Sequence, residues 1–238
     1  MAVRVSVVVP LHNEEENVHV LAEKIQAVFA QMPEVTYECL FVNDGSTDGT
    51  REAVEKAAKA NPQIRPIHLE RRSGQSAALW AGMRRAEGDY VLTLDGDLQN
   101  DPADFPKFLE GLRQYDCVFG YRARRQDTWT KRISSRIANR ARRWWLQDDI
   151  RDTGCGLKGF RRHCIARLVP FNGMHRYFGV FMKAAGMRIA QIEVAHHPRR
   201  FGASKYGIWD RLWRGIYDLV GVAWLRRRYL DIRREGDE

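Results

Sequence analysis

Short β-favouring runs alternate with stretches of helical spacing over the first 120 residues. The strand-like runs are residues 4–9, 37–42, 64–69, 90–94 and 117–119. Helical spacing of apolar residues is found at Val18, Leu21, Ile25 and Val28, over 76–86, and at Phe105, Phe108, Leu109 and Leu112. Compact apolar runs indicate strands, and the longer period indicates amphipathic helices. This order predicts an α/β fold with a mostly parallel sheet and helices on both faces.

A basic amphipathic stretch follows Gly120, at about residues 130–146. One helical face is apolar, with Ile133, Ile137, Ala141, Trp144 and Trp145. Much of the remaining surface is basic, with Lys131, Arg132, Arg136, Arg140 and Arg143. Such a helix with paired tryptophans fits the plane of an anionic membrane. A helix packed on its own domain is the alternative; we expect no nucleic-acid partner, because no groove-reading motif accompanies the charge.

The C-terminal residues 207–238 resume an amphipathic pattern. The apolar stripe comprises Ile208, Trp209, Leu212, Trp213, Ile216, Leu219, Val220 and Ala223. Tryptophan and tyrosine suit the headgroup boundary, and they occur at Trp209, Trp213, Tyr217 and Trp224. We expect a membrane-surface helix and a basic tail, appended to a domain of residues 1–206. A packed or dimer-forming helix is the alternative.

No segment reaches the roughly 20 apolar residues that span a bilayer, and residues 3–9 resemble a strand rather than a signal peptide. We therefore expect peripheral attachment to the cytoplasmic face of the plasma membrane, directly or through a separate membrane protein. The net charge of +9 implies an anionic partner, such as a phosphorylated substrate or an anionic lipid. The four scattered cysteines form no metal-ligand pair, and we expect buried thiols rather than disulfides.

Polar loops follow three of the predicted strands, at residues 10–17, 43–50 and 95–100. Loops at the carboxyl ends of parallel strands meet at one edge of the sheet, where ligands of such folds bind. Each loop taken alone has a structural explanation. Ser46 or Asp48 could cap the next helix, and acidic residues 14–16 could form a solvated first helical turn.

The third loop carries oxygen ligands at Asp95, Asp97 and Gln99, with Gly96 allowing a tight turn. Such a cluster suits Mg²⁺ or Mn²⁺ carrying a diphosphate. A plain turn is the alternative, because Asp and Gly are common in turns.

Four motifs occur in order: Pro10-x-x-Asn-Glu14, Asn-Asp44-Gly-Ser-Thr-Asp-Gly-Thr, Gly74-Gln-Ser-x-Ala78-x-x-x-Gly82 and Asp95-Gly-Asp97-Leu-Gln99. With them the chain resembles the family 2 glycosyltransferases of the GT-A (Rossmann-like) fold. It is most similar there to the dolichol-phosphate mannosyltransferases and the bacterial undecaprenyl-phosphate glycosyltransferases. The resemblance runs from Val3 to about Tyr206.

The resemblance implies roles for individual residues. Pro10, His12, Glu14, Asp44 and Asp95 would bind the nucleotide sugar, with Asp44 accepting from the nucleobase. Asp95, Asp97 and Gln99 would hold the metal, and Gly74, Ala78 and Gly82 would be small for close packing. Asp97 and Asp152 would be catalytic. The acceptor phosphate would be held by Arg122, Lys131, Ser135, Arg199 and Lys205. For His175, in a Gly-Met-His-Arg segment, we favour a structural role.

The expected activity is metal-dependent, inverting transfer of a sugar from a nucleoside-diphosphate sugar to a polyprenyl phosphate. The acceptor phosphate is largely ionised at neutral pH, so a general base is dispensable and positioning dominates. Two alternatives stay open: a soluble glycan or protein acceptor, and a non-catalytic membrane adaptor that retains a nucleotide pocket.

Overall fold

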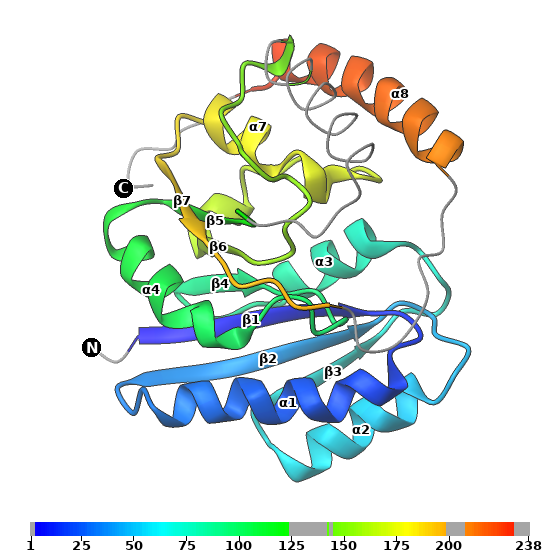
Figure 1. The fold of residues 1–238 in the computed structure, drawn as a ribbon, viewed down its shortest axis with the longest axis vertical. Coiled ribbons are helices and arrows are strands. Elements are labelled where there is room, and N and C mark those ends of the chain that lie inside the picture. The colour runs from blue at the N-terminus through cyan, green and yellow to red at the C-terminus, as the bar shows by residue number, and fades with distance from the viewer. Residues whose placement is uncertain (1–2, 124–141, 143–144, 199–207, 231–238) are drawn as a thin grey trace.

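A seven-stranded sheet forms the centre of the molecule (Figure 1). The computed structural model describes residues 3–123, 142, 145–198 and 208–230, except the side chains of 208–214 and 216. The strands lie in the order β3-β2-β1-β4-β6-β5-β7. Their bounds are β1 (Val3–Leu11), β2 (Val35–Asn43), β3 (Ile64–His68), β4 (Tyr90–Thr93), β5 (Cys117–Tyr121), β6 (Lys158–Arg161) and β7 (Ile189–Glu193). The five strands expected from the sequence are confirmed, and β6 and β7 are additional.

Strand β6 is the one that runs against its neighbours. The pairs β1–β2, β2–β3, β1–β4 and β5–β7 are parallel, whereas β6 pairs antiparallel with both β4 and β5. Lys158 therefore begins β6 opposite Thr93 of β4 and Phe119 of β5. As a result, the segment that leads into β6 lies at the same edge as the loops that leave β4 and β5.

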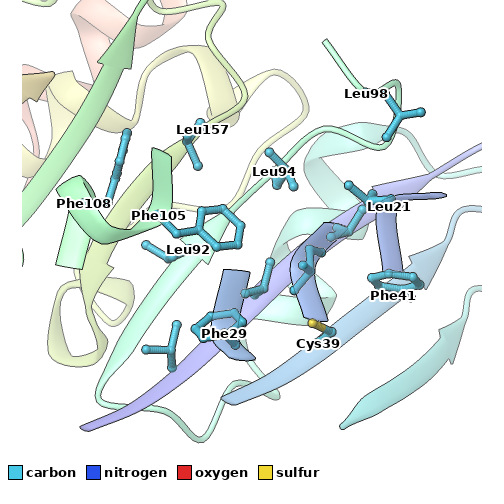
Figure 2. Close-up of a cluster of buried hydrophobic side chains, with 14 of the residues drawn as sticks. Leu21, Phe29, Cys39, Phe41, Leu92, Leu94, Leu98, Phe105, Phe108 and Leu157 are labelled. Atoms are coloured by element: carbon cyan, nitrogen blue, oxygen red, sulfur yellow. The ribbon is translucent and has the colours of Figure 1, made fainter. Parts of the chain in front are cut away.

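Helices cover both faces of the sheet, as predicted. Their bounds are α1 (Glu15–Ala30), α2 (Thr50–Ala60), α3 (Gln75–Met83), α4 (Phe105–Gln114), α6 (Arg162–Ile165), α7 (Phe178–Ala184) and α8 (Ile208–Arg227), with short 3₁₀ helices η1 (Pro102–Asp104) and η2 (Met174–Arg176). Apolar residues of α1, α2 and α4 pack with alternate strand residues into one core (Figure 2). Those of α3, α6 and α7 form a second core on the opposite face. Because both faces are buried, the inner parts of β1 (Val7–Val9) and β2 (Cys39–Val42) are continuously apolar.

The C-terminal helix α8 packs against α7 through a third, smaller cluster. Val222 and Ala223 of α8 are buried there with Phe181 of α7, and Leu219 packs against them. The alternative of a packed helix therefore applies to one face of α8, and the expected membrane contact concerns the other face. Among the described residues, no helix is long and apolar enough to span a bilayer.

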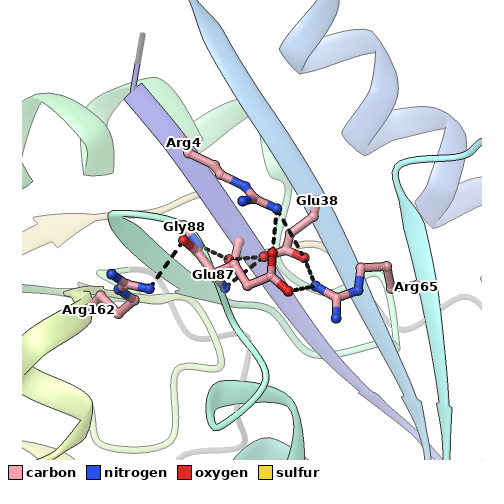
Figure 3. A network of polar contacts seen from close by, with 7 residues as sticks. Arg4, Glu38, Arg65, Glu87, Gly88 and Arg162 are labelled. Carbon is pink, nitrogen blue, oxygen red and sulfur yellow. Dashed lines mark hydrogen bonds and ion pairs between the residues drawn. The ribbon is translucent and has the colours of Figure 1, made fainter. Parts of the chain in front are cut away.

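A charge network crosses the sheet near the amino ends of its strands (Figure 3). Buried Glu38 accepts hydrogen bonds from Ser6 Oγ at 2.7 Å and from the Glu87 amide at 2.8 Å, and it pairs with Arg65. Burial raises the pKa of Glu38, but these hydrogen bonds and the Arg65 charge outweigh it, so the pKa lies below its ordinary value. This network stabilises the edge of the sheet opposite the loops.

All four cysteines, Cys39, Cys117, Cys155 and Cys164, are buried free thiols, as expected. Burial raises the pKa of the Cys39 thiol, which makes it a poor nucleophile.

Candidate active site

The three polar loops meet at one edge of the sheet. Hydrogen bonds join the first two: the Asn13 amide donates to Ser46 Oγ at 3.0 Å and the Glu14 amide to Thr50 Oγ1 at 2.8 Å. Asp48 also supports the start of α2, because its Oδ1 accepts from the Thr50 amide at 3.1 Å, although the N-cap residue itself is Gly49. Ser46, however, bonds across to the first loop rather than capping α2.

Buried Asp44 connects the second loop to the start of α3. Its carboxylate accepts from the amides of Ser73 at 2.6 Å and Gly74 at 2.8 Å, and its carbonyl oxygen lies 3.0 Å from His12 Nδ1. Pro10 is the penultimate residue of β1, and its carbonyl oxygen lies beside Gly96 of the third loop. Among the predicted nucleoside-binding residues, Pro10 thus adjoins the third loop, and His12 and Asp44 contact each other.

Gly74 has a different role from the one expected. Its φ of +93° is the left-handed backbone that favours glycine, and the nearest atom to an added Cβ is 3.9 Å away. Glycine is therefore required at position 74 for its backbone conformation, which lets the Gly74 amide reach Asp44, and not for close packing. Close packing does explain Gly82, where a Cβ would overlap Val8, and Ala78 is fully buried.

Asp95 and Asp97 flank Gly96 at the end of β4, and both face the site. Burial, and then the negative charge of Asp97, raise the pKa of Asp95 to about 6. Asp95 Oδ1 accepts from Gln75 Nε2 at 2.8 Å, and Asp97 Oδ1 accepts from the Gln99 amide at 3.1 Å. This closely spaced negative charge favours a cation.

The residues of the third loop fit a small divalent ion. Within the described part of the chain, no group of three or more His, Cys, Asp and Glu side chains could enclose a metal. Mg²⁺ binds instead through one or two carboxylates and completes its shell with water and substrate phosphates. The two carboxylates of Asp95 and Asp97 provide such a partial set.

Arg122 and Asp152, predicted at the acceptor site, form one buried ion pair. Arg122 Nε lies 2.6 Å from Asp152 Oδ2, and Arg122 Nη2 lies 2.9 Å from Oδ1. Burial lowers the pKa of Arg122, but the bond to Asp152 outweighs it, so the pKa is raised and the guanidinium stays charged. The bidentate contact fixes the guanidinium plane at the end of β5.

The segment that leads to Arg199 lies against the third loop. His196 forms a β-bridge with Asn100, and the His197 amide donates to the Gln99 carbonyl at 2.9 Å. The last described residues before Arg199 therefore lie beside the third loop. Arg199 itself and the other predicted acceptor residues, Lys131, Ser135 and Lys205, lie outside the described residues.

Lys158 and Gln75 are site residues that the sequence analysis missed. Lys158 is only 5% exposed, donates from Nζ to the Cys155 carbonyl, and adds positive charge near Asp95. Burial lowers its pKa. No strand pattern marked its position, because β6 is short and contains Gly159. Gln75 lay inside the quoted Gly74–Gly82 motif, which could have drawn attention to it.

The sheet order and the loop-lined edge define a GT-A glycosyltransferase fold. Glucosyl-3-phosphoglycerate synthase from Mycobacterium tuberculosis, solved with Mn²⁺, UDP and glucosyl-3-phosphoglycerate, superposes with a TM-score of 0.67 at 21% identity, covering 96% of this chain and 81% of that one. A mannosyltransferase from Pyrobaculum calidifontis, in complex with GDP-Man and Mn²⁺, gives a TM-score of 0.64 at 19% identity, covering 100% and 67%.

Sequence comparison assigns the family. The model of glycosyl transferase family 2 matches residues 6–169, and the chain belongs to this family of enzymes. It is 35% identical over 218 residues to the undecaprenyl-phosphate 4-deoxy-4-formamido-L-arabinose transferase of Aeromonas hydrophila, covering 91% of this chain and 66% of that protein. It is 36% identical over 232 residues to the dodecaprenyl-phosphate galacturonate synthase of Rhizobium johnstonii, covering 95% and 68%. The chain thus spans about two thirds of the length of these relatives.

Proposed function

We propose that this glycosyltransferase moves a sugar from a nucleoside diphosphate to a polyprenyl phosphate at the cytoplasmic membrane surface. The proposal is carried by one observation: two groups of charged side chains lie close together at the carboxyl edge of the sheet. Asp95 and Asp97 provide negative charge for a metal-bound diphosphate, and the Arg122–Asp152 pair lies beside them. The relatives named after undecaprenyl and dodecaprenyl phosphate support the choice of acceptor.

The donor is held by the residues that converge on the third loop. Asp44, His12, Pro10 and Glu14 bind the nucleoside end. Asp95, Asp97 and Gln99 hold Mg²⁺ or Mn²⁺, which supplies positive charge to the departing diphosphate.

The acceptor is held by cationic groups. Arg122 grips the phosphate, together with Arg199, Lys205, Lys131 and Ser135 as the family resemblance implies. One oxygen of the ionised phosphate bonds to the anomeric carbon while the bond from that carbon to the diphosphate oxygen breaks, so the carbon inverts and the nucleoside diphosphate leaves. Both oxygens of Asp152 accept from Arg122, so Asp152 acts by orienting this arginine.

The exposed side of α8 is the proposed membrane contact. Tyr217, Val220 and Trp224 are 82%, 49% and 57% exposed and follow one another at helical spacing. Trp145, 43% exposed, is next to Leu146, whose carbonyl accepts from Arg226 of α8 at 2.8 Å. We call Trp145, Tyr217, Val220 and Trp224 the aromatic patch. Aromatic rings of this kind are enriched at the membrane–water boundary.

The test is a transfer assay with purified protein, undecaprenyl phosphate in vesicles, Mg²⁺ or Mn²⁺, and a panel of UDP and GDP sugars. Mass spectrometry should detect a prenyl-phosphate sugar with at least one donor. Asp97→Asn should lower turnover by at least about 100-fold with an unchanged far-ultraviolet spectrum, because it removes a metal-binding charge. Asp149→Asn, at an exposed surface ion pair, is the matched control and should retain activity.

Three outcomes would contradict parts of the proposal. Transfer only to a soluble glycan or protein would assign the alternative acceptor. No transfer with any donor would favour the non-catalytic adaptor. Full turnover by Asp97→Asn would refute the metal assignment.

A further inference from the structure

The turn at residues 173–176 joins the C-terminal helix to the start of α3. We call it the linking turn; it contains η2 and the Gly-Met-His-Arg segment whose function the sequence left open. Figure 1 shows α8 on the outer side of α7 and α3 against the sheet, with the segment before α7 between them. The active-site chemistry described above makes no use of His175 or Arg176.

Toward α3, two hydrogen bonds from the linking turn meet on one side-chain oxygen. His175 Nδ1 lies 2.7 Å from Ser76 Oγ, and the Gly173 amide donates to the same oxygen at 2.9 Å. Ser76 is buried in the first turn of α3. Burial, with the charges of Lys158 and Arg176, lowers the pKa of His175 to about 3, so the imidazole is neutral at this contact. The expected structural role of His175 thus has a specific partner.

The start of α3, with the two residues that precede it, holds two of the donor-site carboxylates, Asp44 and Asp95. Gln75, adjacent to Ser76, donates to Asp95 at 2.8 Å. The amides of Ser73 and Gly74 hold Asp44. A displacement at Ser76 would therefore move groups that position the predicted metal and nucleobase ligands together.

Toward α8, the linking turn ends in an ion pair. Arg176 Nη2 lies 2.6 Å from Asp218 Oδ2 of α8. Gly173, with φ +98°, lies beneath this pair, because a Cβ there would be 3.1 Å from Arg176 Nη2 and 3.2 Å from Asp218 Oδ2. Asp218 directly follows Tyr217 of the aromatic patch. The helix that carries the patch thus contacts the same turn that holds Ser76.

We propose that His175 is a positioning residue for the donor site, and that the linking turn couples the seating of α8 to the first turn of α3. The inference rests on the proposed function in that it takes the Asp44–Asp95 edge as the donor site. His175 touches neither donor nor acceptor in this account and acts through Ser76. Asp218 and Arg176 act one step further away, by fixing the turn from the α8 side.

A double-mutant cycle tests the contact between His175 and Ser76. The measurement is the affinity for UDP and for GDP with Mn²⁺ and without lipid. His175→Leu and Ser76→Ala should each weaken binding of the accepted nucleotide roughly 5- to 30-fold, and the double variant no more than the weaker-binding single variant, because contacting residues are non-additive. His175→Asn places a polar atom near the position of Nδ1 and should restore affinity to within about threefold of wild type.

Hydrogen exchange tests the coupling without any nucleotide. His175→Leu and Asp218→Ala should each raise the exchange rates of amides 75–78 by at least about tenfold through local opening. The matched control is Lys183→Ala on α7, which removes an exposed ion pair with Asp149. This variant should change neither the exchange rates of amides 75–78 nor the nucleotide affinity.

The outcomes separate the two proposals. Wild-type exchange rates at 75–78 in both variants, or wild-type nucleotide affinity in folded His175→Leu, would overturn the inference. If the wild type binds no nucleotide, the proposed function fails, while the exchange rates still decide whether the linking turn holds α3. Loss of affinity explained entirely by unfolding would also overturn it, and urea titration of each variant measures that contribution.

Discussion

Among individual residues, Asp95 is the most constrained by its surroundings. Its carboxylate lies against the backbone of Gly156, where any Cβ would overlap it. Asp97 adds a like charge, and the positive charges of Lys158 and Arg122 only partly offset the penalty of burial. The carboxylate is thus held where a metal would bind, at a cost to the stability of the metal-free protein.

Asp95→Asn should stabilise the metal-free protein at neutral pH. A pKa raised from 3.8 to about 6 means that folding favours the protonated form of Asp95. The stability that this protonated acid contributes to the folded state is fully present below about pH 4 and is lost as pH rises through about 6. Because one pH unit corresponds to about 1.4 kcal/mol, the charged form costs on the order of 2–3 kcal/mol at neutral pH.

Urea unfolding in EDTA, at about pH 4 and about pH 7.5, measures this difference. The variant should exceed wild type in free energy of unfolding only at the higher pH, and Mn²⁺ should stabilise wild type alone. If variant and wild type differed in free energy of unfolding by the same amount at both pH values, the charge of Asp95 would not destabilise the folded protein.

Candidate site residues could be placed from the sequence where polar side chains directly follow a predicted strand. Asp44, Asp95 and Asp97 could be placed at the site because polar residues after parallel strands gather at one edge. The role of Gly74 was misjudged, because backbone conformation and packing both select glycine. Gly156 could not be predicted, because its neighbour Asp95 is 61 residues away and only the folded sheet brings them together.

Among the elements, β6 shows the limit of local pattern. Its sequence, Lys-Gly-Phe-Arg, has no β-branched residue, and it becomes a strand because β4 and β5 pair with it on both sides. Tertiary context thus overrides propensity. Four of the five strands predicted correctly contain an apolar run of at least three residues, and β3 is the exception. The meeting of Arg122 with Asp152 depends on the reversed direction of β6 and could not be deduced from spacing.

Helix α8 combines the two interpretations that the sequence offered. One face packs on α7, and the opposite face presents three residues of the aromatic patch. The Arg228 guanidinium lies 4.8 Å from the Trp224 ring centre, so a cationic group stacks on an aromatic ring of the patch just after α8 ends.

Replacing Tyr217 and Trp224 together with serine should weaken vesicle binding and spare nucleotide affinity. Burial of a large apolar side chain is worth about 1.5–3 kcal/mol, so we expect a loss of at least about tenfold in partitioning. Liposome flotation is the measurement. Tyr115→Ser, at another exposed aromatic residue outside the patch, is the control and should float like wild type. Equal flotation of all three proteins would exclude the patch as the membrane contact.

At the scale of the whole molecule, stabilising and binding charges are segregated. The Glu38 network occupies the amino edge of the sheet, and the proposed substrate site occupies the carboxyl edge. The chain also carries a net charge of +9, with basic residues concentrated after Gly120. A positive protein with an aromatic patch should approach an anionic surface by long-range attraction and stay by apolar contact.

Vesicle binding should therefore depend on lipid charge and on salt. Vesicles with about 30% anionic lipid should bind the protein, and neutral vesicles should bind it at least roughly tenfold more weakly, because each basic residue near an anionic surface contributes about 1 kcal/mol. Raising NaCl from about 0.05 M to about 0.5 M should reduce binding to the anionic vesicles by a similar factor. Sedimentation with both vesicle types across the salt series measures this dependence. Binding that changed neither with salt nor with lipid charge would contradict the electrostatic account.

The Arg122–Asp152 ion pair has a consequence for how such enzymes diversify. Arg122 directly follows β5, and Asp152 lies in the segment before β6. The ion pair between them therefore holds together the two ends of segment 123–151. Because the pair holds those two ends together, we expect changes in chain length between residues 123 and 141 to leave the pairing of β5 with β6 unchanged. Under the proposed function, the acceptor side could then vary in sequence while the residues that hold the sugar donor keep their positions.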